Sequence, residues 1–168
     1  DHHECKEQLP QCAAVVDPHR PDRTYPHTML SGVGIAFKLA AALSGDQDAV
    51  ARRYCDLICL GTIADVMTLQ GENRRLVVMG LEALRQPQRL GLRALIHACG
   101  CDEQEITAGT IGYILAPRVN AAGRMEQAEL AVRLFLTQDP QEADRLAETL
   151  CRLNRERQTI ESEIYGEA

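Results

Sequence analysis

One short apolar segment limits the choice of fold more than any other part of the sequence, because it alone has the character of a strand. Residues 12–17 read Cys-Ala-Ala-Val-Val-Asp and are bounded by Pro10 and Pro18, which is typical of a buried strand. A strand needs neighbours, so its partners are expected upstream of Asp1. The sequence therefore predicts an α/β fold, in which the C-terminal part of a parallel-sheet domain runs into a mostly helical connector. The first residue is not Met, and we expect the chain to be a piece of a longer polypeptide.

Helical periodicity marks most of the remaining sequence. Residues 18–26 are too rich in proline for regular structure and are expected to form a loop. Ser31 is placed to cap a helix that ends near Gly45. A second helix is expected after Asp48 through Leu60, with loosening over 61–66, and a third from a cap at Asn73 to Leu84. A helix over 107–115 is expected to end before Pro117. Three more helices are expected over residues 90–98, 126–136 and 140–165.

Composition and charge exclude several classes of protein. The 168 residues are 45% hydrophobic and 25% charged, so the chain can bury a core and is not expected to be disordered. No segment approaches the ~18 consecutive apolar residues of a membrane helix, and we expect a cytoplasmic protein with no membrane contact. The net charge of −6 lacks the basic balance usual in nucleic-acid binders. However, 16 of the 18 basic residues are Arg, whose planar guanidinium suits phosphate oxygens.

The cysteines favour a reducing environment. Seven is an odd number, and the spacings match no paired zinc motif. Cys55 and Cys59 stand one helical turn apart in an apolar run. We therefore expect reduced thiols that act as small hydrophobic side chains in a core.

Two sequence features carry metal-binding side chains. Asp1-His2-His3 places two imidazoles beside a carboxylate, which can supply a metal ligand, a group that orients it and a polar contact to phosphate. Such a His pair is also common on surfaces and in tag remnants. Asp65 lies within an apolar run, where an unpaired carboxylate would be costly to bury. It either caps a helix after Gly61 or binds a divalent cation, which would offset the burial of its charge.

A third feature is the segment Pro117-Arg118-Val119-Asn120-Ala121-Ala122-Gly123-Arg124. Its small residues allow close approach of the backbone to another surface. We interpret it as a loop in which exposed amides, Arg118, Asn120 and Arg124 could hold phosphate. The alternative is an ordinary turn between helices with solvated arginines.

Taken in order along the chain, several segments resemble the DHH-family phosphoesterases. They are Asp1-His2-His3, residues 30–39 (Leu-Ser-Gly-Val-Gly-Ile-Ala-Phe-Lys-Leu), residues 61–67, residues 73–77, residues 118–124 and residues 153–158 (Leu-Asn-Arg-Glu-Arg-Gln). The resemblance covers essentially the whole chain. The Asp-His-His triplet is shared across the family, whereas the other segments resemble its single-stranded-DNA-specific exonucleases.

The resemblance implies a two-metal hydrolase that uses Mn²⁺ or Mg²⁺. It places His2 and Asp65 at metal-ligand positions, and His3 at a catalytic position beside the scissile phosphate. Asp1, also catalytic, would hold the imidazole tautomer by hydrogen bonding. Arg124 matches an arginine that contacts substrate phosphate near the 5′ end. Asn120 and Arg118 join the phosphate-binding set through their proximity to it.

The implied function is 5′-to-3′ hydrolysis of single-stranded DNA in DNA repair and recombination, together with a helicase and a single-strand-binding protein. The alternatives are a family phosphodiesterase for short oligoribonucleotides or cyclic dinucleotides, and a non-catalytic replication scaffold. The family's acidic motifs are expected upstream, since Asp46-Gln47-Asp48 lacks the following Gly and reads as a turn with a helix cap. We therefore expect this chain alone to be inactive.

The resemblance also divides the chain into three regions. Residues 1–70 would be the C-terminal portion of the DHH catalytic domain, and residues 71–138 a helical region that completes the catalytic core. Residues 139–168 would be a long connector helix that leads toward a DHHA1 substrate-binding domain.

Overall fold

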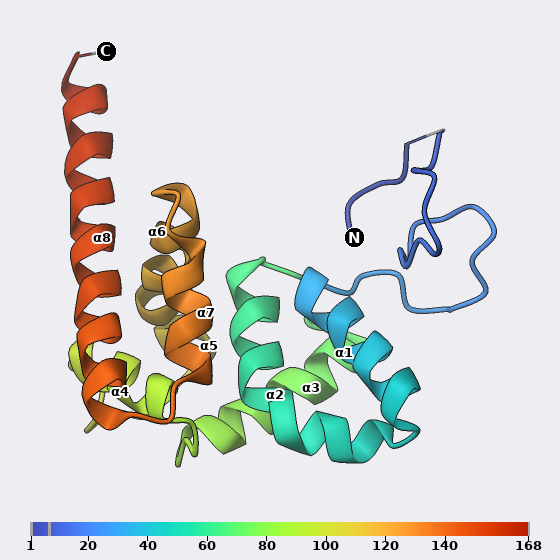
Figure 1. Cartoon of the computed structure of the whole chain (residues 1–168), viewed down its shortest axis with the longest axis horizontal. Helices are drawn as coiled ribbons and strands as arrows, with labels where there is room; N and C mark the ends of the chain where they lie inside the picture. The colour runs from blue at the N-terminus through green and yellow to red at the C-terminus, as the bar shows by residue number, and fades with distance from the viewer. Residues whose placement is uncertain (1, 7, 168) are drawn as a thin grey trace. The chain divides into compact units, whose positions relative to one another are not determined.

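The computed structural model describes residues 2–6 and 8–167 (Figure 1). The regular elements among these residues are all helices, and the chain divides into two compact units between residues 83 and 84. The first unit contains α1 (Gly32–Ser44), α2 (Gln47–Ala64) and nearly all of α3 (Gly71–Leu84). The second contains α4 (Leu90–Ala98), α5 (Ala108–Thr110), the π-helix η1 (Ile111–Leu115), α6 (Ala116–Arg124), α7 (Ala128–Leu136) and α8 (Pro140–Glu167). Among the described residues no helix is both long and apolar enough to cross a bilayer.

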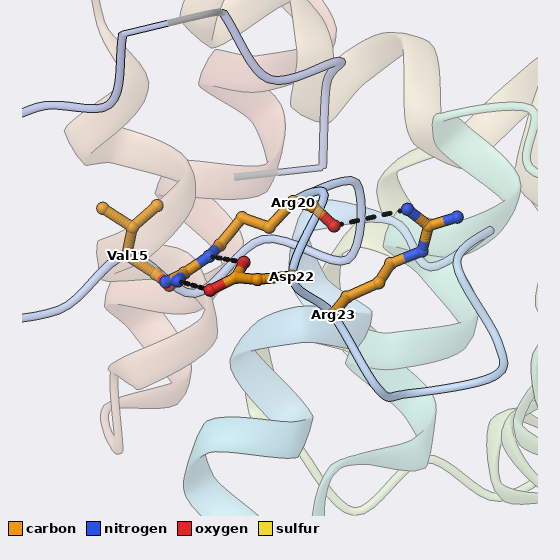
Figure 2. A network of polar contacts seen from close by, with 4 residues as sticks. All are labelled: Val15, Arg20, Asp22 and Arg23. Carbon is orange, nitrogen blue, oxygen red and sulfur yellow. Dashed lines mark hydrogen bonds and ion pairs between the residues drawn. The ribbon is translucent and has the colours of Figure 1, made fainter.

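The predicted strand over residues 12–17 is wrong, and the parallel sheet is absent from the described residues. The segment is irregular and largely exposed, with Val16 46% accessible. Without a neighbouring strand its backbone must find other partners. Figure 2 shows one of them: the Arg20 guanidinium donates to the Val15 carbonyl at 2.8 Å while also pairing with Asp22. The expected loop over 18–26 is confirmed. Only the helical part of the α/β prediction is confirmed.

The first two helices form where the sequence predicts them. Ser31 accepts a hydrogen bond from the Gly34 amide as the N-cap of α1, and Gly45 ends that helix with a φ of 72°. Asp46 caps α2 by accepting from the Ala49 amide at 2.9 Å, as expected for a cap without a metal role. A core of apolar side chains joins the elements of this unit: Phe37, Ala41, Val50, Ala51, Ile58 and Leu76.

The predicted loosening of the second helix over 61–66 is wrong for most of that segment. Helix α2 continues to Ala64. Tertiary contacts stabilise this last turn: Gly61 packs so closely on Val33 that an added Cβ would lie 2.7 Å from its Cγ1. The neighbouring Thr62 hydroxyl lies 3.1 Å from that of Ser31. The end of α2 is therefore fixed to the start of α1.

The cysteine prediction is correct for the core but incomplete. All seven cysteines are free thiols, and Cys55, Cys59, Cys101 and Cys151 are buried. Cys55 and Cys59 form the surface of α2 on which Gly80 of α3 packs. Cys12, in contrast, is exposed, because the segment that was expected to be a buried strand is not one.

In the second unit the predicted stop at Pro117 is wrong. The helix passes from α5 through η1 into α6, with Pro117 in the first turn of α6. A proline lacks the amide that would bond to the preceding turn, and a wider π turn accommodates this loss. The helices expected over 90–98, 126–136 and 140–165 are confirmed as α4, α7 and α8. Figure 1 shows α4 against the N-terminal half of α8, where Leu146 and Leu150 are buried.

Candidate functional site

The structure brings together two of the side chains predicted to bind metal. The His2 Nε2 atom lies 2.8 Å from Asp65 Oδ2, although the two residues are far apart in the sequence. Asp65 is the C-cap residue of α2, and its amide donates to the Gly61 carbonyl at 3.0 Å. Its side chain is 41% exposed, so the predicted burial of this carboxylate is wrong. It ends the helix, as one reading predicted, and it also meets an imidazole.

Two helix ends and their buried hydroxyl groups position this pair. The His2 ring lies against Gly32, where an added Cβ would come within 3.4 Å of Nδ1. Gly32 is the first residue of α1, directly after Ser31. The hydroxyls of Ser31 and Thr62 are 3.1 Å apart, and each residue is 1% exposed. This buried contact holds the start of α1 beside the end of α2, and so holds His2 beside Asp65.

Asn73 secures the segments that flank the pair. It was predicted to cap the third helix, but α3 begins two residues earlier, at Gly71, and Asn73 is 1% exposed within its first turn. Its amide donates inward, to the carbonyl of Met29 and, at 3.1 Å, to that of Thr68. One side chain thus joins the approach to α1 with the loop that follows Asp65.

Sequence reasoning overlooked these positioning residues. Ser31 was identified only as a cap, and Thr62 was not singled out. The available signal was a small hydroxyl residue within an apolar helix, which must find a partner when it is buried. The sequence does not say which partner, because that depends on the packing of α1 against α2.

A second polar cluster fastens the loop that leads from the N-terminal segment to α1. Lys38 forms an ion pair with Glu72, and the Tyr25 hydroxyl donates to the same carboxylate at 2.7 Å. Burial opposes the charge on Lys38, but the hydrogen bonds to Glu72 and Tyr25 outweigh it and raise the pKa of the amine. Burial and the bond to Glu72 likewise raise the pKa of Tyr25.

The remaining members of the triplet are placed differently. The His3 ring contacts that of His2, with centroids 4.2 Å apart and planes inclined by 38°. His3 is exposed, so it can reach a bound molecule. Asp1 lies outside the described residues, and its predicted role stays a prediction.

The predicted phosphate-binding segment is a helix. Residues 116–124 form α6, so its amides bond within the helix, and the proposed grip by loop amides is wrong. Ala121 and Ala122 are fully buried, which explains the small residues by packing. Asn120 and Arg124 are exposed and, four residues apart, share one face of α6.

Arg118 faces differently from these two residues. One of its guanidinium nitrogens donates to the Ile114 carbonyl at 2.7 Å, which satisfies an acceptor at the π turn. Its Nε atom is buried and has no hydrogen-bond partner in the described part of the chain. The structure therefore separates Arg118 from the exposed pair and ties it to the interior of the second unit.

Two ligands do not complete a divalent metal site. Two atoms bound at right angles to one ion, each at ~2.1 Å, lie ~3 Å apart. The 2.8 Å separation of His2 Nε2 and Asp65 Oδ2 is close to that value. An imidazole and a carboxylate also suit Mn²⁺. However, no group of three or more His, Cys, Asp or Glu side chains suitable for a metal occurs among the described residues. The pair can supply part of a coordination sphere.

Comparisons with known proteins confirm the likeness seen in the sequence. No family model matches the chain. It is 47% identical over its whole length to the single-stranded-DNA-specific exonuclease RecJ of Bacillus subtilis, and 36% identical to that of Escherichia coli. It covers 21% and 31% of those proteins, so it spans between a fifth and a third of their length.

Solved structures agree with the sequence matches. The crystal structure of Thermus thermophilus RecJ in complex with Mn²⁺ superposes on 99% of this chain with a TM-score of 0.84 at 37% identity. The chain covers 25% of that structure. The Mg²⁺ complex from the same organism gives a TM-score of 0.74 over 88% of the chain, which covers 23% of that structure. The chain is thus similar to a segment of RecJ in both sequence and fold.

Proposed function

We propose that this chain serves as a segment of a RecJ-type exonuclease that hydrolyses phosphodiester bonds in single-stranded DNA with Mn²⁺ or Mg²⁺. The observation that carries the proposal is the meeting of His2 and Asp65 at 2.8 Å. Similarity to single-stranded-DNA-specific exonucleases, and to RecJ structures with Mn²⁺ or Mg²⁺ bound, supports it.

Within this proposal, His2 and Asp65 are ligands of one divalent ion, and other residues of the complete protein supply the remaining ligands. Bound metal ions would lower the pKa of a water molecule and stabilise charge on the phosphate. His2 must then offer the lone pair of Nε2, so its proton resides on Nδ1, the atom that faces Gly32. His3, in ring contact with His2, is placed to contact the scissile phosphate.

Substrate phosphate is assigned to the exposed face of α6. Arg124 offers a planar set of donors to phosphate oxygens, and Asn120 lies on the same face. Arg118 contributes positive charge from behind this face. These contacts carry no base information, in keeping with a nuclease that selects strandedness.

The broader expectations belong to the same proposal. They are digestion from 5′ to 3′, a role in DNA repair and recombination in the cytoplasm, and cooperation with a helicase and a single-strand-binding protein. The three-region division at residues 70/71 and 138/139 is part of it as well. Since the described residues bring together only His2 and Asp65 as ligands, we expect the 168-residue chain alone to hydrolyse no DNA.

Asp65→Asn in the complete protein tests the proposal. The change keeps the size of the side chain but removes its charge, and we expect Mn²⁺-dependent degradation of single-stranded DNA to fall by about 100-fold or more. Asp102→Asn is the matched control, because Asp102 is another exposed carboxylate paired with a histidine, 3.0 Å from His97 Nδ1. Its activity should stay at the wild-type level.

The outcomes separate the competing functions. Wild-type activity in Asp65→Asn would contradict the metal assignment. Turnover of short oligoribonucleotides or cyclic dinucleotides without degradation of DNA would favour the other phosphodiesterases. A folded protein that hydrolyses none of these substrates would favour a scaffold.

A further inference from the structure

The second unit contains a pair of thiols that the proposed nuclease chemistry does not use. The Sγ atoms of Cys99 and Cys151 lie 4.0 Å apart, although the residues are separated by 52 positions. Cys99 is the C-cap residue of α4, and Cys151 lies within α8. The two helices pack against each other, so the thiols meet across a helix interface.

The backbone around Cys99 is fixed by a complete helix-ending motif. The Cys101 amide donates to the Ile96 carbonyl at 3.0 Å, and the Gly100 amide donates to that of His97 at 2.8 Å. These bonds require a left-handed residue between the two cysteines, and Gly100 supplies it with a φ of 67°. Cys99 is thus held in one orientation at the end of α4.

Cys151 faces the same helix end from α8. Its thiol lies 3.7 Å from the Ala98 carbonyl, one residue before Cys99. Cys101 is a less suitable partner for a disulfide, because its thiol is directed at the Cys99 carbonyl at 3.6 Å and the residue is 1% exposed. The geometry therefore favours Cys151 as the partner of Cys99.

We propose that Cys99 and Cys151 are a redox-active pair that a peroxide or a thiol-specific oxidant converts into a disulfide between α4 and α8. The sulfurs must approach by about 2 Å to reach bonding distance. This is a movement that side-chain rotation and a small helix shift supply. The site is a modification site on the second unit, independent of the metal ligands.

Exposure assigns the order of the two steps. Cys99 is half-buried, whereas Cys151 is 7% exposed, so Cys99 meets the oxidant first. Its thiolate attacks one oxygen of hydrogen peroxide, which breaks the O–O bond and yields a sulfenic acid and hydroxide. The proton released by the Cys99 thiol converts this hydroxide into water. The Cys151 thiolate then attacks the Cys99 sulfur, forms the S–S bond and displaces a second water once a proton is added. Two thiols and one peroxide give one disulfide and two waters.

The surroundings make the reaction slow at neutral pH. Burial, and then the proximity of Cys151, raise the pKa of Cys99 to about 12, and Cys101 acts in the same direction. Arg118 of α6 opposes them, because its positive charge stabilises the thiolate. Since the thiolate is the reactive form, the rate should rise about tenfold per pH unit in the range below this pKa.

Non-reducing peptide mapping of the whole chain tests the proposal. Cys5 and Cys12 are first replaced by Ser, because Cys12 is exposed and Cys5 half-buried, and either could join two molecules. After treatment with hydrogen peroxide or diamide, we expect the tryptic peptide that carries Cys151 to be linked to the one that carries Cys99 and Cys101. Dithiothreitol should release the link.

Single variants and an internal control identify the partner. The link should persist in Cys101→Ser and disappear in Cys99→Ser, and tandem mass spectrometry of the unsubstituted peptides locates the bond if a variant fails to fold. Cys59 is the internal control: burial raises the pKa of its thiol to about 12 as well, and it should stay reduced. A Cys101–Cys151 link, over-oxidation of Cys99 without a link, or a link formed only in denaturant would overturn the proposal.

Discussion

Replacing Asn73 by Asp separates two roles for a buried amide that the sequence alone confuses. If Asn73 capped α3, as the sequence predicts, Asp would serve about as well, because the two residues rank alike as N-caps. In the structure the amide instead donates to the carbonyls of Met29 and Thr68. A carboxylate has no proton to donate, so it would face two carbonyl oxygens in a buried place.

The magnitudes follow from those two bonds. Asn73→Ala loses both, at about 0.5–1.5 kcal/mol each, so the free energy of unfolding should fall by about 1–3 kcal/mol. Asn73→Asp adds an uncompensated buried charge worth about 3–5 kcal/mol. The favourable position of a negative charge in the first turn of α3 returns about 0.3–1 kcal/mol of this. The Asp variant should therefore be the less stable of the two.

Urea unfolding followed by far-ultraviolet circular dichroism measures both changes. Asn120→Asp is the control: Asn120 is exposed on α6, and the change should stay within about 0.5 kcal/mol of wild type. An Asn73→Asp variant as stable as Asn73→Ala, or more so, would refute the inward role of this side chain.

The remaining predictions concern packing and pH. Gly80→Ala should destabilise the first unit by about 1–3 kcal/mol, because its Cβ would lie 2.3 Å from the Cys55 carbonyl oxygen and force α3 away from α2. Gly123→Ala, whose Cβ meets nothing within 4 Å, should stabilise α6 by about 0.5–1 kcal/mol in the same thermal or urea unfolding assay, and the opposite ranking would contradict the packing. Hydrogen bonds from Thr137 and Arg133 lower the pKa of Glu142 at the start of α8. The contribution of Glu142 to stability is therefore present above the ordinary carboxyl pKa and is lost as the pH falls through the lower pKa of the folded state. Glu142→Gln should flatten the acid limb of the curve of stability against pH. An unchanged acid limb would refute this role.

Local sequence signals predicted most of the helices, because caps and periodicity act within a few residues. Ser31, Gly45 and Asp46 end or begin helices as their side chains and backbone preferences dictate. An apolar run between two prolines predicts a strand over 12–17, yet a strand forms only with a partner. Pro117 predicts the end of a helix, and the sequence does not show that a π turn can accommodate it.

The candidate site was predicted in part for a similar reason. His2 and Asp65 were selected by residue type and family resemblance, and the structure places them in contact. The predicted burial of Asp65 is wrong because Asp65 follows the last turn of α2, where the chain leaves the helix at the protein surface. The contacts that hold the pair, through Thr62 and Asn73, depend on how α1, α2 and α3 pack, which no local pattern records.

Pulsed electron paramagnetic resonance of Mn²⁺ bound to the complete protein shows whether His2 and Asp65 share a cation. We expect hyperfine coupling to an imidazole nitrogen that disappears in His2→Gln. The coupling should persist in His97→Gln, because His97 is paired with Asp102 in the second unit. Asp65→Asn should weaken Mn²⁺ binding without unfolding the protein. Bound Mn²⁺ with no nitrogen coupling in the wild type, or with the same coupling in His2→Gln, would show that His2 is not a ligand of the ion.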